Sequence, residues 1–131
     1  MFPQTQSPLR VMLVEDELAM AMALEMYMQD AGMSVVGPVA RLEQALSLAR
    51  RQKLDAALLD INVGGERTFP VADLLIQRRI PFLFFSGYGP DSLPPAYRGH
   101  RVLDKLSHVQ TLISALIEAL DPKAQAAGKT K

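Results

Sequence analysis

Five short apolar segments constrain the fold of this chain more than any other feature. They are rich in Val, Leu and Phe, do not alternate with polar residues, and cover residues 9–14, 34–39, 55–59, 81–85 and 101–103. Uninterrupted apolar runs of this length predict strands that are buried on both faces, as in a parallel sheet.

Segments with helical spacing separate these runs. They cover residues 17–31, 41–53, 70–79 and 107–120. Gly32 ends the first, Pro70 lies in the first turn of the third, and Ser107 with Gln110 forms a capping-box signature for the last. Strands that alternate with helices predict an α/β fold, a doubly wound five-stranded parallel sheet with helices on both faces.

The connection between the fourth and fifth runs differs from the others. Its sequence, GYGPDSLPPAYRGH, holds three prolines and three glycines. An interior proline costs a helix about 3 kcal/mol. We therefore expect the fourth helix to be short, irregular or missing.

Composition excludes several classes of function. The 131 residues suit one domain, expected at 9–120 between tails at 1–8 and 121–131. The 14 basic and 14 acidic residues cancel, so no charge excess favours nucleic acid or an anionic membrane. Without cysteine, disulfides and thiolate chemistry are excluded. No apolar run reaches the roughly 18 residues of a membrane span, and the start is unlike a signal peptide, so we expect a cytoplasmic protein.

Polar residues follow four of the apolar runs, where a parallel sheet places its ligand site. They are Glu15, Asp16, Asp60, Asn62, Ser86 and Lys105. Two carboxylates about 4 Å apart repel by roughly 4 kcal/mol at an effective dielectric of about 20, so three together need a cation. Hard oxygen ligands favour Mg²⁺, and Lys105 and Ser86 could hold phosphate oxygens.

Each residue alone has an ordinary structural interpretation. Asp16 could cap a helix, Asp60 could begin the turn before Gly64, Ser86 could belong to a turn, and Lys105 could be a surface lysine. Their joint occurrence at four strand ends favours a single site.

Four motifs carry a resemblance to a known family: VEDE at 14–17, LLDIN at 58–62, FFSGYG at 84–89 and VLDKL at 102–106. Over residues 9–120 the chain resembles the receiver domain of bacterial two-component response regulators, which implies a flavodoxin-like (βα)5 fold. The resemblance implies that Asp60 accepts a phosphoryl group from a histidine kinase or a histidine phosphotransfer protein. It also implies Mg²⁺ at Glu15, Asp16 and Asp60 with the Asn62 carbonyl, and the switch roles of Ser86 and Lys105. Such a protein is a phosphoacceptor, with at most slow self-dephosphorylation, and not a turnover enzyme.

The chain departs from the family pattern at several positions. Leu106 replaces the usual proline, Val102 the usual switch aromatic, and Gly64 a frequent proline. FFSGYG and the prolines after it are similar to the FATGUY subclass of receivers, in which the fourth helix is short, missing or mobile. We hypothesise that Tyr88 takes the role of the missing aromatic.

The first helix has two apolar stripes. At 100° per residue, one stripe is expected to face the core: Met20, Leu24, Tyr27, Met28 and Ala31. The other, Leu18, Met22 and Met26 with Ala19, is expected to be exposed and to dock a kinase or phosphotransfer protein. In the alternative interpretation these residues are only good helix formers that loops partly cover.

With no output domain after residue 120, we expect a stand-alone protein that signals through protein binding, as a monomer or weak homodimer.

Three other functions compete with this interpretation. A flavin-binding protein of the same fold would need a phosphate-binding loop where Glu15, Asp16 and Glu17 stand. A phosphohydrolase with an aspartyl nucleophile would need a cap and further motifs. A degenerate receiver would act as a phosphorylation-independent interaction module, and the full set of site residues argues against it.

Overall fold

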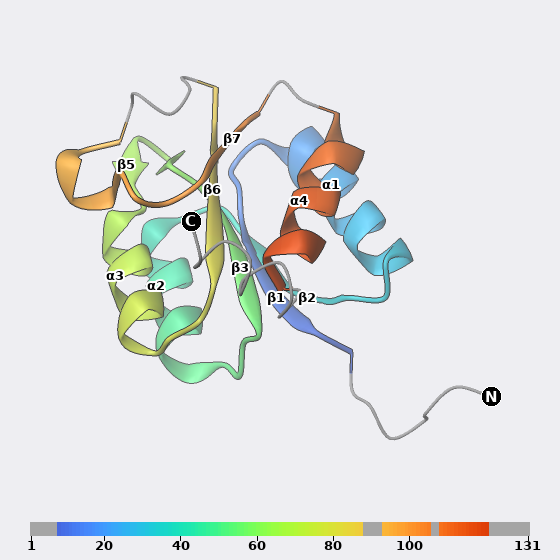
Figure 1. Ribbon diagram of the computed structural model, residues 1–131, viewed down its shortest axis with the longest axis horizontal. Coiled ribbons are helices and arrows are strands. Elements are labelled where there is room, and N and C mark those ends of the chain that lie inside the picture. Colours follow the sequence, from blue (N-terminus) through green and yellow to red (C-terminus); the bar gives the residue numbers. More distant parts are fainter. Residues whose placement is uncertain (1–7, 88–92, 106–107, 121–131) are drawn as a thin grey trace.

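The computed structural model describes residues 8–87, 93–105 and 108–120. Strands and helices alternate along the chain (Figure 1), in the order β1 (Arg10–Val14), α1 (Leu18–Asp30), β2 (Ser34–Val39), α2 (Leu42–Arg51), β3 (Ala56–Asp60), β4 (Asn62–Val63), β5 (Glu66–Arg67), α3 (Phe69–Gln77), β6 (Phe82–Ser86), the 3-10 helix η2 (Pro95–Tyr97), β7 (Val102–Asp104) and α4 (Val109–Leu120). The predicted tails at 1–8 and 121–131 lie outside the described residues, except for Pro8.

The main sheet has five parallel strands in the order β2-β1-β3-β6-β7. This confirms the predicted parallel α/β fold. Strands β3, β6 and β7 each begin and end one residue later than predicted, because backbone pairing continues through the polar residue that follows the apolar run. Asp60, for example, is still paired with Phe85 in the ladder.

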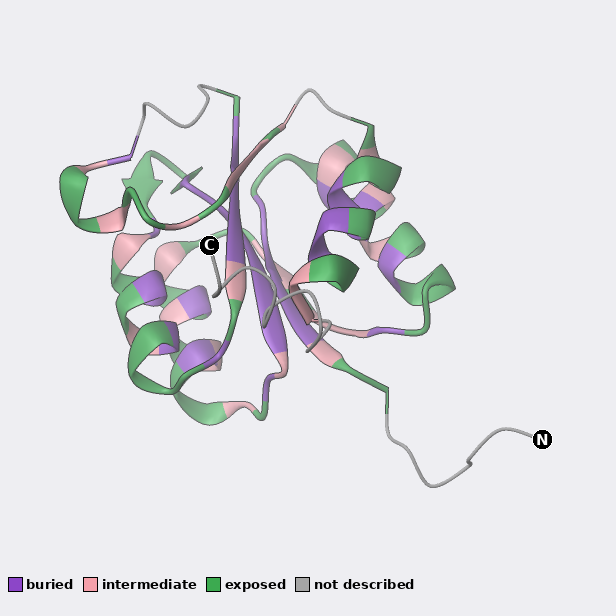
Figure 2. Ribbon diagram, in the orientation of Figure 1, coloured by how far each residue is buried: buried purple, intermediate pink, exposed green. Residues whose placement is uncertain are grey.

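Figure 2 shows the central strands buried along most of their length, with helices on either side of the sheet. Their alternate residues face two separate cores. On one side, Met12, Leu59 and Phe84 pack with α2 and α3. On the other side, Leu13, Leu58 and Phe85 pack with α1 and α4. Because both faces are covered, the central strands are buried along almost their whole length, as the apolar runs predicted.

Helix α1 corrects one part of the sequence analysis. Leu24 and Met28 are fully buried as predicted, but Tyr27 is 39 % exposed and Ala31, just past the helix end, is exposed. Ala21 is buried instead. The buried face is therefore narrower than an ideal helical projection suggests, because only one edge of α1 meets the sheet and α4.

The connection between β6 and β7 is irregular where it is described. Residues 93–101 contain only η2, in agreement with the predicted short or irregular fourth helix. The capping residue Ser107 lies outside the described residues, and α4 is described from Val109 onward. Within the described part of the chain, no helix is long and apolar enough to span a bilayer.

Candidate functional site

The predicted site residues meet at the carboxyl edge of the sheet. Asp60 and Ser86 are the last residues of β3 and β6, and Lys105 directly follows β7. Glu15 and Asp16 directly follow β1. Since all these strands are parallel, their ends lie at the same edge (Figure 1).

Lys105 connects the acidic residues. Its Nζ lies 3.0 Å from Asp60 Oδ2 and 2.9 Å from Glu15 Oε1, and it donates to Glu15 Oε2 at 3.1 Å. A third carboxylate, that of Glu17, lies 3.9 Å away. Burial alone would lower the pKa of Lys105, but its hydrogen bonds to Glu15 and Asp60 outweigh that effect and raise the pKa above its usual value. The ammonium therefore stays charged at neutral pH.

Glu15 is the most buried carboxylate of the site, with 2 % of the residue exposed. Burial raises the pKa of Glu15 to about 7, although hydrogen bonds from the Glu17 backbone and from Lys105 act in the opposite direction. Apart from the ion pair with Lys105, its Oε1 atom accepts no hydrogen bond from the described residues. A buried carboxylate oxygen with spare lone pairs suits a cation.

Asp16 is exposed and is held by the loop after β3. Its Oδ2 accepts a hydrogen bond of 2.8 Å from the Gly64 backbone, in the turn between β4 and β5. This bond is the main reason why the pKa of Asp16 lies below its usual value. The short antiparallel pair β4-β5 was not predicted from the sequence. Its turn nevertheless positions Asp16, which was predicted as a site residue.

Thr68 is a site residue that the sequence analysis missed. It is fully buried, and its hydroxyl donates to the backbone carbonyl of Asp60 at 2.7 Å. Its own N–H donates to the Ile61 carbonyl at 2.9 Å. Thr68 therefore fixes the backbone of Asp60 through its carbonyl group. A threonine just before Phe69-Pro70 reads as a helix cap, but the hydroxyl makes no cap bond in α3.

A cavity of about 370 Å³ opens above Asp60, and it is lined by Asp16, Asp60, Asn62, Ser86, Gly87 and Lys105. The Asn62 N–H donates to Asp60 Oδ1 at 3.2 Å. Ser86 is buried, and its carbonyl accepts from the Lys105 N–H at 2.8 Å, which ties β6 to the lysine. Five of the six predicted site residues, all but Glu15, thus border one space.

The donor set fits a hard divalent cation. One carboxylate oxygen from each of Glu15, Asp16 and Asp60 lies within 4.8 Å of the other two. Three carboxylates and one ammonium leave an excess of negative charge, and oxygen ligands without histidine or cysteine favour Mg²⁺. Such an ion keeps part of its hydration shell, which phosphate oxygens can replace.

Two calls on the family pattern fall on residues that the structure does not describe. They are the departure at Leu106 and the hypothesis that Tyr88 takes the role of the missing aromatic. Val102 is described, is half-buried and pairs with Phe84 in the sheet. An aliphatic side chain therefore occupies that position of β7.

Comparisons with known proteins agree with this geometry. The model of the response regulator receiver domain matches residues 11–116. The solution structure of SdrG from Sphingomonas melonis Fr1 is 36 % identical with a TM-score of 0.75, covering 88 % of this chain and 98 % of that one. The BeF3-activated conformation of SdrG from Pseudomonas melonis Fr1 is 38 % identical with a TM-score of 0.70 and the same coverage, 88 % and 98 %.

A third structure is the receiver domain of the PhyR response regulator from Erythrobacter litoralis. It is 25 % identical with a TM-score of 0.76, covering 87 % of this chain and 91 % of that one. Among curated proteins, none matches the chain.

Proposed function

The chain belongs to the response regulator receiver family, and from this we propose that Asp60 accepts a phosphoryl group from the phosphohistidine of a kinase or phosphotransfer protein. The observation that carries the proposal is the position of the Asp60 carboxylate. It is 5 % exposed, borders the cavity, and is held by Lys105 on Oδ2 and by the Asn62 N–H on Oδ1. A surface aspartate in a turn would have no such fixed surroundings.

In the proposed step, a carboxylate oxygen of Asp60 attacks the phosphorus of phosphohistidine. The new O–P bond forms as the P–N bond breaks, and the imidazole leaves with its electron pair and takes up a proton. Phosphoryl transfer needs mainly positioning and charge stabilisation. Lys105 and Ser86 line the cavity and would hold the transferred oxygens, and the Thr68 hydrogen bond would keep the backbone of the nucleophile in position.

Mg²⁺, held by Glu15, Asp16 and Asp60 with the Asn62 carbonyl, would neutralise charge on the phosphoryl oxygens. The acyl phosphate adds about −1.5 to −2 charges to an acidic cavity. We expect Ser86 and Lys105 to move toward it and thereby to change the β6-β7 connection.

The test is treatment with acetyl phosphate, with and without Mg²⁺, followed by mass spectrometry of the intact protein. We expect a gain of one phosphoryl group that needs Mg²⁺ and is lost in Asp60→Ala. Asp30→Ala, at the exposed end of α1, should react like the unaltered chain. An unmodified chain under all conditions, or equal labelling of Asp60→Ala, would refute the proposal and favour the phosphorylation-independent module.

We further propose that the protein is a phosphoacceptor with slow self-dephosphorylation and not a turnover enzyme. A flavin role is disfavoured, because Glu15 and Asp16 would repel a flavin phosphate. We place the phosphotransfer reaction in the bacterial cytoplasm, as the resemblance to bacterial receivers implies.

Helix α1 is the proposed docking surface for the phosphodonor. Leu18, Met22 and Met26 are 73 %, 59 % and 55 % exposed, and α1 follows the acidic pair at the site edge. Large exposed apolar side chains on one helix are typical of a partner surface, and methionine adapts to different partners.

We expect Met22→Lys to slow phosphotransfer from the cognate donor about tenfold or more, and to leave labelling by acetyl phosphate unchanged. Ile117→Lys, on the exposed face of α4, is the matched control because Ile117 is 47 % exposed. The docking proposal fails if Met22→Lys changes neither the transfer rate nor self-association.

A further inference from the structure

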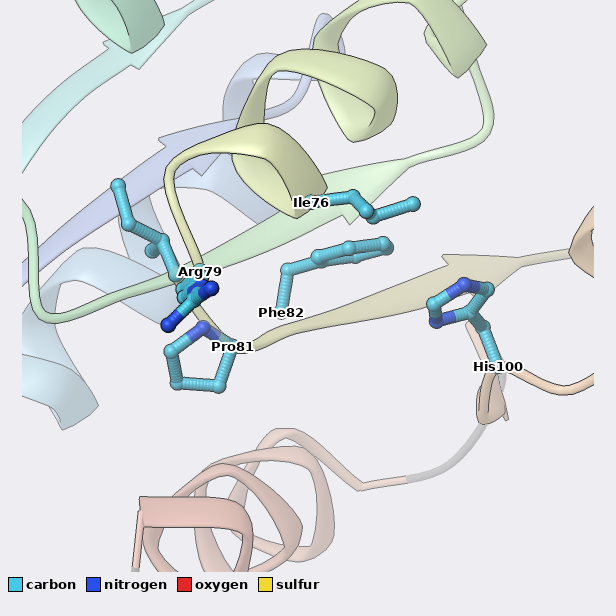
Figure 3. Close-up of a pocket in the computed structure, with 6 residues that line it drawn as sticks. Ile76, Arg79, Pro81, Phe82 and His100 are labelled. Atoms are coloured by element: carbon cyan, nitrogen blue, oxygen red, sulfur yellow. The ribbon is translucent and has the colours of Figure 1, made fainter.

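A second pocket lies at the opposite edge of the sheet. It has a volume of about 360 Å³ and is lined by Ile76, Arg79, Ile80, Pro81, Phe82 and His100 (Figure 3). Phe82 begins β6 and Ser86 ends it, so at about 3.3 Å per residue the pocket lies roughly 13 Å along the strand from the phosphoacceptor edge. This pocket is therefore separate from the site around Asp60.

The floor of the pocket is apolar. The rings of Phe82 and His100 stack with centroids 4.9 Å apart at 26°, and Ile76 at the end of α3 is 45 % exposed. Figure 3 shows Ile76 and Phe82 next to each other, with Arg79 and Pro81 on one side and His100 on the other. An aromatic or aliphatic side chain from another molecule could pack against this floor.

Within the part of the chain that the structure describes, the arginines in and next to the pocket have no acidic partner. Among the described residues, no carboxylate pairs with the side chain of Arg79, and none pairs with the exposed Arg98 or Arg101 on either side of His100 in the chain. The neighbouring Arg78 differs, because its guanidinium donates to the carbonyls of Ala49 at 2.7 Å and Gln52 at 2.9 Å. Arg78 has a structural role, whereas the Arg79 charge at the pocket is paired with no carboxylate that the structure describes.

The backbone of Arg79 provides a second, independent observation. Helix α3 ends in a Schellman turn, in which the Ile80 N–H donates to the Leu75 carbonyl at 2.9 Å and the Arg79 N–H to the Ile76 carbonyl at 3.0 Å. Arg79 occupies the left-handed position of this turn with φ +59°, where glycine is preferred. It is the only non-glycine residue with positive φ among those described.

Helix α1 ends in the same kind of turn and shows the usual solution. There the Met33 N–H donates to the Met28 carbonyl at 3.0 Å, and Gly32 holds the left-handed position with φ +87°. The chain thus uses glycine at one Schellman turn and arginine at the other, although arginine is strained in this conformation. Strain that is retained beside a pocket points to a function for the side chain.

We propose that this pocket binds an acidic segment of a partner protein that carries one aromatic or aliphatic anchor residue. A carboxylate of the segment pairs with the Arg79 guanidinium, and the anchor packs against Ile76 and Phe82. The charge of the rim and the apolar floor together select this class of ligand. Nucleic acid is less suited, because the chain as a whole has no net positive charge.

The test uses the ¹⁵N-labelled chain and three capped peptides. The probe peptide is Asp-Glu-Phe-Glu-Asp, and the comparison peptides replace Phe by Ala or every acid by Lys. We expect the probe to shift the amides of Ile80, Phe82 and His100 saturably, the Ala peptide to bind about tenfold more weakly, and the Lys peptide not to bind. Shifts confined to other residues, or equal shifts with the Lys peptide, overturn the proposal. Stronger shifts of the same amides by a short single-stranded oligonucleotide overturn it as well.

Arg79→Gly separates a binding role from a structural one. Glycine relieves the strained turn, so the denaturation midpoint should rise while affinity for the probe falls about tenfold or more. Arg41→Gln, which removes the same charge at the start of α2, should leave probe affinity unchanged. A lower midpoint or an unchanged affinity in Arg79→Gly overturns the proposal.

Discussion

Thr68 lies next to Asp60, the proposed nucleophile, and its hydroxyl connects the start of α3 to the end of β3. The group is fully buried, and it donates to the Asp60 carbonyl at 2.7 Å. Removal of a buried donor leaves its acceptor unsatisfied, which costs more than the hydrogen bond itself contributes. Thr68 is therefore important both for stability and for the position of Asp60.

We predict that Thr68→Val lowers the free energy of unfolding by about 1–3 kcal/mol, measured by urea denaturation. Valine keeps the shape and removes only the donor. Thr111→Val in α4 is the control, because Thr111 is exposed there, and it should change stability by less than about 0.5 kcal/mol. Equal effects of the two substitutions would show that the buried hydrogen bond contributes nothing specific.

The sequence predicted the site because polar residues follow apolar strands. Parallel strands bring such residues to one edge whatever their separation in the chain, and Lys105 meets Glu15 across 90 positions in this way. Thr68 escaped this reasoning because it begins a helix and acts through a backbone carbonyl. Such a contact depends on the backbone conformation of the segment after β3. No periodic pattern in the sequence predicts that conformation.

At the scale of elements, Tyr97 ties the irregular β6-β7 connection to α3. Its hydroxyl donates to Asp73 Oδ1 at 2.7 Å, and its ring stacks on Phe69 with centroids 4.6 Å apart. Phe69 follows Thr68 and also contacts Phe84 edge-on at 5.8 Å. Where a fourth helix is usual in this fold, aromatic packing and one hydrogen bond hold the connection in place.

The link between Tyr97 and Asp73 predicts a dependence on alkaline pH. The hydrogen bond to Asp73, together with burial and the charge of that carboxylate, raises the pKa of Tyr97 to about 12. The neutral phenol is the donor, so the stabilisation is complete below the unfolded pKa of about 10 and is lost as the pH rises toward about 12.

Ultraviolet titration of the tyrosinate absorbance measures this effect. We expect the chain to show one late ionisation step, absent in Tyr97→Phe and shifted to lower pH in Asp73→Asn. If the late ionisation step persists in Tyr97→Phe, it does not belong to Tyr97, and the hydrogen bond to Asp73 does not raise the pKa of this phenol.

The types of the main elements could largely be predicted from the sequence. Which face of a helix is buried, and where very short strands form, could not. Apolar runs and helical spacing located five strands and four helices, and the prolines located the irregular connection. The exposed Tyr27 was assigned to the core, because spacing alone does not say how wide a face of α1 the neighbouring elements cover. The pair β4-β5 has only two residues in each strand and leaves no periodic signal.

At the scale of the whole molecule, the two edges of the sheet differ in charge. The carboxyl edge gathers Glu15, Asp16 and Asp60 around one lysine, whereas Arg79 and Arg101 at the opposite edge pair with no carboxylate of the described residues. The net charge is +0, so this asymmetry comes from placement and not from composition. Lys105 compensates only part of the charge of the three carboxylates, so their repulsion would be relieved further by a bound cation.

We therefore predict that Mg²⁺ stabilises the folded chain. A ligand present at 100 times its dissociation constant adds about 2.7 kcal/mol, so the thermal midpoint should rise with Mg²⁺ concentration and saturate. Asp16→Asn should weaken this response strongly, whereas Asp30→Asn, an exposed residue at the end of α1, should not. A thermal midpoint that does not change with Mg²⁺ concentration, or an unchanged response in Asp16→Asn, would contradict the metal site.

The central claim is that Asp60 is the phosphoacceptor, and mapping of the modified residue tests it most directly. After reaction with acetyl phosphate and Mg²⁺, borohydride reduces an aspartyl phosphate to a stable product that peptide mass spectrometry can locate. We predict a single modified residue, Asp60. Modification of Glu15 or Asp16 in its place, or of no carboxylate, would contradict the account.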